Sequence, residues 1–161
     1  MRKLCVVLAL LGSVAPAAAE VGPPVDLATR ARGAGKVVVA RIVDVRAQFE
    51  TNRFGDQLIV SHAVLEVLET LKGAPQAVEN VAVEGGTVGD LTLKVSDLPS
   101  LAEGDRAVFF LDATSGGNQP HDRGRGIMKL DESDHVAGSQ LSLDDVRQQV
   151  RGALSQTRGG R

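Results

Sequence analysis

The sequence predicts a mainly β fold: a small five-stranded barrel with a short N-terminal helical turn and a C-terminal helix. Runs rich in Val, Ile and Leu alternate with short segments that contain Gly and Pro, which is the pattern of strands joined by turns. Several runs are apolar on both faces, as in long, bent strands that serve two sides of a small barrel. Extended helical spacing of apolar residues occurs only near the C-terminus.

Residues 1–19 have the three parts of a secretory signal peptide. Arg2 and Lys3 form a basic start, a short apolar run follows, and residues 17–19 are alanines suited to cleavage. The apolar run is shorter than the ~20 residues that a transmembrane helix needs. A retained membrane anchor is the alternative interpretation. We expect a mature chain that begins at Glu20, has no membrane span, and is periplasmic or secreted.

The composition of the mature chain narrows the function classes. Cys5 is the only cysteine and lies in the signal peptide, so neither disulfides nor thiol chemistry are expected after cleavage. Without Arg2 and Lys3, 16 of the 18 basic side chains remain against 20 acidic ones, a formal charge of −4. This balance argues against nucleic acid or anionic lipid as the main partner. The chain also contains no Trp or Tyr, so it lacks the aromatic platforms on which bases stack.

Before the strands, the sequence predicts a leader and a helical turn. Residues 20–25 form an extended leader, because two adjacent prolines fix φ and lack a donor. A single domain is expected over residues 26–155, followed by a flexible tail over residues 156–161. Asp26 can cap a single helical turn that glycines end.

Five strands are then expected, at residues 36–49, 58–69, 78–83, 90–97 and 106–112. One face of the first strand is expected to carry Val37, Val39, Val43 and Val45. The fourth has the cleanest alternation, which predicts three core-facing side chains, Leu91, Leu93 and Val95. The fifth is apolar on both faces.

Gly85, Gly86 and Gly89 precede the predicted fourth strand and resemble a phosphate-binding loop. Such a loop needs a helix directly behind it, so that backbone N–H groups and the helix dipole face the anion. Here a strand is expected to follow, and no Gly-Lys-Ser or Gly-Lys-Thr is present. We therefore interpret the glycines as a turn or bulge that needs positive φ.

The last third of the chain is expected to be a polar loop, a hairpin and a helix. Residues 113–126 predict a mobile polar loop, and residues 127–138 a weak hairpin around a turn. Over residues 141–154, Ser142 and Asp145 have the spacing of a capping box. The apolar residues follow at helical intervals and predict a helix lying on the barrel: Leu143, Val146, Val150 and Leu154.

Three segments resemble a known superfamily: "RGAGKVVVARIVDV" (32–45), "LEVLETLKG" (65–73) and "LPSLAEGDRAVFFL" (98–111). They are similar to the opening strand, the second strand ending in Lys-Gly, and the turn into a later buried strand of the TIMP and netrin-type (TIMP-like) OB-fold superfamily. The chain also resembles uncharacterised exported bacterial proteins with the same landmarks. The resemblance implies an OB-like barrel. The inhibitors of that superfamily begin with a zinc-chelating cysteine, whereas this mature chain is expected to begin with Glu20.

The chemistry-bearing residues give one enzymatic alternative. His62 lies within a predicted strand and is expected to be a barrel histidine with a satisfied partner. His121 with Asp122, and residues 131–135 with His135, could meet and bind a cation, which would make a metal-dependent enzyme. Two polar turns without metal are the interpretation we favour. The sequence contains neither His-Glu-x-x-His nor Gly-x-Ser-x-Gly, and we expect no cofactor.

The sequence therefore favours an exported, non-enzymatic binding module whose partner is another exported or envelope protein. Phe49 and Phe54 bracket the loop between the first two strands, where they either form a partner-binding patch or fold back to plug the barrel end. An inhibitor-like protein acting on an exported protease is one version, in which Glu20 and Val21 of the leader would contact the partner. A structural envelope protein is the alternative.

Overall fold

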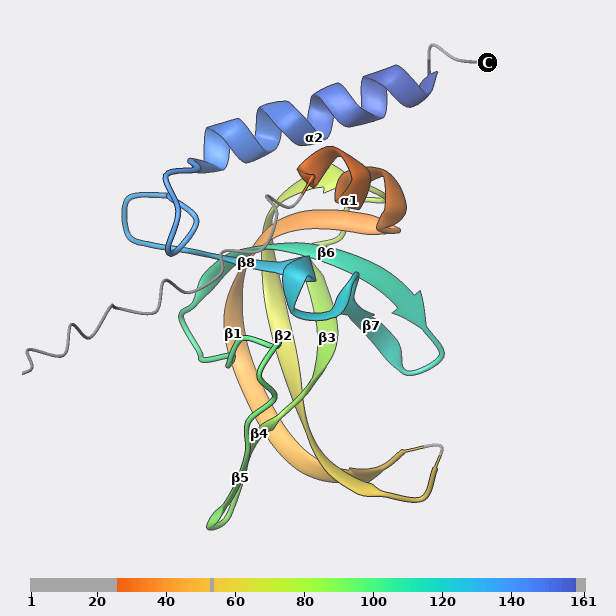
Figure 1. Ribbon diagram of the computed structural model, residues 1–161, viewed down its shortest axis with the longest axis vertical. Coiled ribbons are helices and arrows are strands. Elements are labelled where there is room, and N and C mark those ends of the chain that lie inside the picture. The colour runs from red at the N-terminus through yellow and green to blue at the C-terminus, as the bar shows by residue number, and fades with distance from the viewer. Residues whose placement is uncertain (1–25, 53, 159–161) are drawn as a thin grey trace, which may run out of the picture.

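The computed structural model describes residues 26–158 except Arg53, and it is mainly β (Figure 1). The residues of the expected signal peptide and leader, Glu20 and Val21 among them, lie outside the described residues. The elements are α1 (Leu27–Gly33), β1 (Lys36–Thr51), β2 (Gln57–Lys72), β3 (Val78–Glu84), β4 (Gly86–Val88), β5 (Leu91–Leu93), β6 (Arg106–Thr114), β7 (Gly117–Pro120), the 3-10 helix η1 (Arg123–Gly126), β8 (Ile127–Leu130) and α2 (Leu143–Arg158).

Five strands form a closed, barrel-like ring, which confirms the expected fold class. The order β1-β2-β3-β7-β6 returns to its start because β6 also pairs with β1. All of these pairings are antiparallel except that of β3 with β7, which is parallel and consists of the single pair Val81–Asn118. β8 adds to β6 beside β7. β4 and β5 form a separate two-stranded hairpin that projects from one end of the ring (Figure 1).

The fifth strand of the ring is β7, not the predicted strand over residues 90–97. Only residues 91–93 of that segment are extended in β5, and Leu91 is 61% exposed. The predicted loop over residues 113–126 instead contains β7 and η1. β7 is held by backbone pairing to β6 across a tight turn, with Thr114 opposite Gly117. The side chains of β7 are not fully buried, so its sequence does not show the apolar alternation of a core strand.

β1 changes face partway along its length, which corrects the prediction for its four valines. Val37 and Val39 pack under the helices, but Val43 is 46% exposed and Val45 packs inside the ring. The register to β2 shifts between Ile42 and Asp44, leaving Val43 as an extra residue. Such a bulge moves the side chains that follow it to the opposite face of the strand. Alternation with a period of two residues therefore does not continue across it.

The apolar core has two parts because β1 and β6 are buried on both faces. Inside the ring lie Val38, Ala40, Ile42, Ala63, Leu65, Val81, Val83, Ala107, Phe109, Leu111 and Ile127. The other face of β1 and β6 packs against the two helices through Leu27, Ala31, Ala34, Val37, Val39, Val108, Phe110, Val136, Leu143, Val146, Val150 and Ala153. Figure 1 shows α1 and α2 together across one end of the ring.

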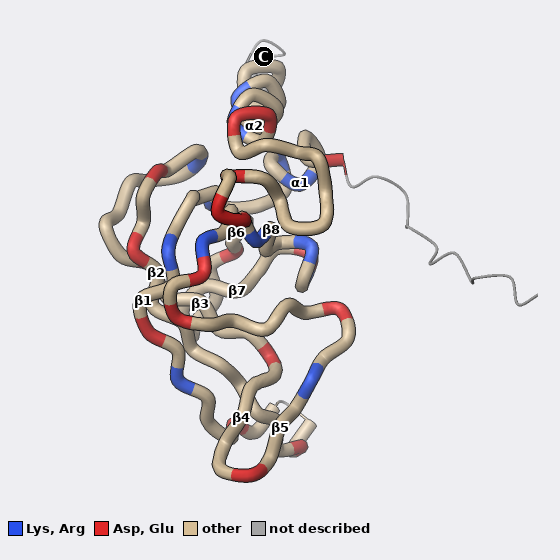
Figure 2. The backbone as a smooth tube through the Cα atoms, turned by 90° about the vertical axis from the view of Figure 1, so that its left-hand side faces the viewer, with Lys and Arg blue, Asp and Glu red and all other residues tan. Residues whose placement is uncertain are grey.

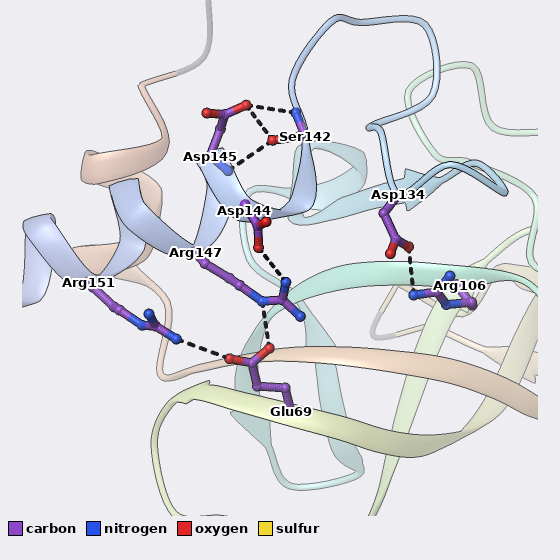
Figure 3. Close-up of polar contacts among 8 residues, drawn as sticks. All are labelled: Glu69, Arg106, Asp134, Ser142, Asp144, Asp145, Arg147 and Arg151. Atoms are coloured by element: carbon purple, nitrogen blue, oxygen red, sulfur yellow. Dashed lines mark hydrogen bonds and ion pairs between the residues drawn. The ribbon is translucent and has the colours of Figure 1, made fainter.

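Both helices begin at predicted caps. The Asp26 side chain accepts a hydrogen bond from the Ala28 amide, and α1 ends before Ala34. At α2, the Ser142 amide donates to Asp145 (3.0 Å) and the Asp145 amide to the Ser142 hydroxyl (3.2 Å), a reciprocal capping box (Figure 3). The helix continues to Arg158, four residues beyond the end at residue 154 expected from the sequence.

The expected hairpin over residues 127–138 is present in short form. β8 pairs with β6, and the chain then turns back so that Leu130 and Val136 form an isolated bridge. A second bridge joins His135 to Ser142 at the start of α2. Asp134 in the turn lies 2.7 Å from the Arg106 guanidinium on β6 (Figure 3), which fixes the hairpin against the ring.

Candidate functional site

A cleft of about 860 Å³ opens at the end of the ring opposite the two helices. β1, β2 and β3 form its floor, and the β4–β5 hairpin and residues 94–103 form its walls. The apolar lining residues are Val45, Ala47, Val83, Leu93, Val95, Leu98, Pro99 and Leu101. Its volume lies in the range of small-molecule and peptide sites in proteins.

The floor of the cleft follows from the bulge in β1. Because side chains alternate along a strand, Val45, Ala47 and Phe49 share the face that the bulge turns toward the cleft. The first two line the cleft, and Phe49 extends the same face toward the β1–β2 turn. These two small side chains leave the cleft open above the strand.

The glycines ahead of β4 form the corner that carries the hairpin over this floor. Gly85 and Gly86 have φ values of 109° and 128°, and a Cβ at Gly86 would collide with the Ser61 hydroxyl. That hydroxyl donates to the Gly85 carbonyl at 2.7 Å. Strand β4 begins at Gly86, so the prediction of a corner with positive φ is confirmed.

The two phenylalanines are exposed at the same end of the molecule. Phe49 is 46% and Phe54 74% exposed, so the alternative in which they plug the barrel end is wrong. The Asn52 side chain holds the turn between them by accepting from the Phe54 and Asp56 amides, both at 2.9 Å. Leu91 is exposed at the tip of the β4–β5 hairpin, which projects from this end in both views (Figures 1 and 2).

Acidic side chains predominate around the cleft and the two tips. Three carboxylates here, Asp56, Asp90 and Glu103, have no ion-pair partner among the described residues, against one such cation, Lys94. Glu50 is paired, because His62 Nε2 lies 2.5 Å from its carboxylate. Hydrogen bonds from Gln48 and then from His62 lower the pKa of Glu50. Among the described residues, this end of the molecule therefore carries more unpaired acidic than basic side chains.

His62 is therefore not a barrel-interior histidine. Its side chain is 40% exposed on β2 and faces Glu50 on β1. The prediction that it has a satisfied partner is confirmed, but the partner lies at the surface.

His121 forms a pair with Asp112 near α1, away from the cleft. The His121 Nδ1 atom lies 2.7 Å from Asp112 Oδ2, and the Gly35 amide donates to Asp112 Oδ1 at 3.0 Å. Burial raises the pKa of Asp112, but the hydrogen bonds from His121 and Gly35 outweigh it and hold that pKa below its usual value. His121 is thus held in place by a carboxylate that also anchors the turn into β1.

His135 belongs to a different arrangement, at the turn after β8. Its amide donates to the Asp131 side chain at 2.9 Å, as does the amide of Ser133. These backbone hydrogen bonds lower the pKa of Asp131. The structure does not join residues 131–135 to His121 in a metal site: across residues 26–158, Arg53 aside, no three His, Cys, Asp or Glu side chains could hold a metal ion together.

A second cleft, of about 810 Å³, lies between the end of β2 and α2. It contains three cations, but each has a protein partner. Lys72 donates to the carbonyls of Ala31 (2.9 Å) and Arg32 (2.8 Å) at the end of α1, and burial lowers its pKa. Arg32 lies near Asp26, and Arg151 near Glu69 at 3.4 Å (Figure 3). These contacts give the cations a structural role.

Sequence reasoning found the phenylalanines but missed the cleft beside them. The alternation of Leu93 and Val95 predicts a strand of the ring, whereas both residues line the cleft. The adjacent Gly85 and Gly86 were the available signal, because they take the chain out of the ring and over its open end.

The chain matches no family model and no curated protein. No helix in the described part of the chain is long and apolar enough to cross a membrane. The fold and the cleft define a small barrel-like β domain with an apolar cleft at one end.

Proposed function

We propose that this protein is an exported, non-enzymatic binding module that engages another exported or envelope protein through the open end of its ring. The observation that carries the proposal is an open apolar cleft at the end of the molecule where Phe49 (46%), Phe54 (74%) and Leu91 (61%) are also exposed. Exposed large apolar side chains and apolar clefts are typical of protein interaction sites.

The alternatives have less support from the geometry. In a metal-dependent enzyme, His121 and His135 would share a site, but each is held in its own hydrogen-bonded turn. An inhibitor-like role through Glu20 and Val21 rests on the family resemblance and on the extended leader that its two prolines favour. A structural envelope protein would have no need of an open cleft, although it could use the same apolar end for assembly.

The proposal is tested by affinity capture from the periplasm or medium of the native host. We expect the mature protein to retain a partner that the Phe49→Ala/Phe54→Ala variant does not. Both side chains are substantially exposed, so this variant should remain folded. A third bait that begins at Val25 examines the leader: loss of a protease only from this bait would indicate the inhibitor-like version.

A matched control removes similar apolar area elsewhere. Leu68 and Val78 are 44% and 54% exposed and lie near the β2–β3 turn, away from the β1–β2 turn. The Leu68→Ala/Val78→Ala variant should capture the same partner as the unaltered protein. Identical captures from all variants would show that the open end is not the interface. One equivalent of bound metal, lost in His121→Ala or His135→Ala, would favour the enzyme instead.

A further inference from the structure

One edge of β1 is left unpaired beside the cleft. Over residues 36–41 this edge pairs with β6, and at Ile42 it exchanges backbone hydrogen bonds with Asp105 (2.9 Å) and Gly104 (2.8 Å). Beyond the bulge at Val43, β6 no longer pairs with β1. In the described chain, the backbone of residues 44–51 pairs in the sheet only with β2, on the opposite edge.

An unpaired edge of this length is a site for another strand. Its alternate N–H and C=O groups point away from β2, and no residue between 43 and 51 is fully buried. Proteins ordinarily shorten, cover or bend such edges, because they pair readily with other chains. The adjoining hairpin approaches the face of the strand through Gly86, and its two strands pair with each other and not with this edge.

The cleft determines which side chains an added strand would carry. A strand beside β1 would direct every second side chain to the face of Val45, Ala47 and Phe49, and therefore into the cleft. The floor residues Val45 and Ala47 are small, and the walls are apolar at Leu93 and Leu98. Large apolar side chains at alternate positions would fill this volume.

The charge around the cleft determines which side chains are favoured at the other positions of an added strand, those that face away from the cleft. The side chains on the other face of an added strand would lie beside Asp44, Arg46 and Glu50 of β1, where Asp44 already pairs with Arg46 at 2.9 Å, and one end would approach Glu103. Opposite charges on neighbouring strands stabilise a sheet, and like charges destabilise it. Lysine or arginine is therefore favoured beside Glu50 and Glu103.

We infer that the partner binds by adding an extended segment to the free edge of β1 between residues 43 and 51, with large apolar side chains in the cleft and basic side chains on the other face. The inference rests on the proposed function and specifies how the partner is recognised. A second copy of this chain fits less well, because Val45 and Ala47 are too small to fill the cleft and two acidic rims would meet. The chain's own leader also fits less well, because it contains two prolines, which lack the N–H donors that pairing with the edge requires.

The probe is a synthetic peptide of about eight residues that alternates leucine and lysine, long enough to pair along this edge. We expect it to bind the intact protein and to slow hydrogen exchange of alternate amides within residues 44–51. N-methylation of every second residue along one edge of the peptide should weaken binding at least about tenfold, because it removes several backbone hydrogen bonds. N-methylation along the other edge, which faces solvent, should have little effect.

The contributions of charge and of the cleft to peptide binding are each tested with matched peptides or variants. A peptide that alternates leucine and glutamate should bind more weakly, and Glu103→Lys should weaken binding of the lysine peptide. Glu132→Lys, in the exposed turn after β8, should not. Phe49→Ala should weaken binding, and Leu68→Ala, at an exposed position of β2 away from this edge, should not.

The outcomes separate this inference from the proposed function. Strand addition is overturned if both methylated peptides bind equally, or if the protected amides lie outside residues 44–51. Dimerisation of the protein through the same amides, seen by light scattering, would overturn it in favour of a second copy. If capture of the partner does not depend on Phe49 and Phe54, the proposed function fails, whatever the peptides show.

Discussion

Lys36, at the start of β1, and Glu79, near the start of β3, form an ion pair in which the two side chains are only 17% and 5% exposed. The other oxygen of Glu79 accepts a hydrogen bond from Asn118 on β7 at 2.9 Å. β3 and β7 are paired in the sheet only at Val81 and Asn118. The ion pair therefore reinforces the position at which the ring has its least backbone pairing.

Replacing only one member of this pair should be costly. Lys36→Met leaves the Glu79 carboxylate buried without its cation, so we expect the free energy of unfolding to fall by about 3–5 kcal/mol. The double variant Lys36→Met/Glu79→Leu should recover much of that loss, because no buried charge remains. Urea unfolding at pH 7 measures both. Arg41→Met, which breaks the half-exposed pair with Glu66, serves as control and should change stability by less than about 1 kcal/mol. Additive losses in the double variant would contradict this account.

The stability of the fold should depend on pH through Asp112. Its pKa is lower in the folded protein than in the unfolded chain, so the ionised carboxylate favours folding above the unfolded value of about 4. This contribution is lost as the pH falls through the folded pKa. Asp112→Asn should therefore lower the urea midpoint at pH 7, and the difference from the unaltered protein should shrink at pH 3. An equal difference at both pH values would mean that the contacts of Asp112 do not depend on its charge.

The capping box of α2 should contribute measurably to stability, since α2 covers the outer part of the core (Figure 3). Ser142→Ala removes the hydroxyl that accepts from the Asp145 amide and should lower the free energy of unfolding by about 1 kcal/mol. Ser133→Ala, in the exposed turn before it, is the matched control and should change little. Thermal and urea unfolding followed by circular dichroism would reveal the difference, and equal effects of the two substitutions would rule out the cap.

Export remains a prediction from the sequence. Cleavage after Ala19 should give a mature protein that begins at Glu20, because the segment before it has the basic, apolar and small-residue regions of a signal peptide. Mass spectrometry of protein recovered from the periplasm or medium of a bacterial host measures this directly. Recovery of full-length chain from the cytoplasm, with Met1 present, would show that the segment does not act as a signal.

The elements that could be predicted from sequence are those that bury apolar side chains. β6 and the first half of β1 are apolar on both faces because one face packs in the ring and the other beneath the helices. β7 could not be predicted, because backbone hydrogen bonds hold it in place, and residues such as Gln119 remain exposed. β5 was placed wrongly because Leu93 and Val95 alternate as in a ring strand while lining a cleft.

The candidate site could be predicted only in part for a similar reason. From the sequence, Phe49 and Phe54 could form either an exposed patch or a plug of the barrel end, and only the structure shows that both are exposed. The free edge of β1 depends on where β6 leaves its neighbour, and this is set by the bulge at Val43. Val43 has no local feature that distinguishes it from the other valines of the strand, so a single sequence does not reveal the bulge.

Arg30 on α1 is a buried charge that has no ion-pair partner among the described residues. It is 5% exposed, and its guanidinium lies 5.3 Å from the centroid of the Phe110 ring. Within the part of the chain that the structure describes, its Nε and Nη2 atoms have no hydrogen-bond partner. Burial lowers its pKa, an effect that the nearby Asp122 opposes and Arg125 reinforces. The stacking on Phe110 compensates for only part of the lost hydration.

Arg30→Met should therefore raise the free energy of unfolding by roughly 1 kcal/mol, because it keeps the packing on Phe110 and removes unsatisfied donors. Arg30→Ala should lower it instead, since the shorter side chain leaves a cavity beneath α1. Urea unfolding of the two variants beside the unaltered protein distinguishes packing from charge. If Arg30→Met is as destabilising as Arg30→Ala, the guanidinium stabilises the fold through its charge. Its contact with the Phe110 ring would then be a stabilising cation–π interaction.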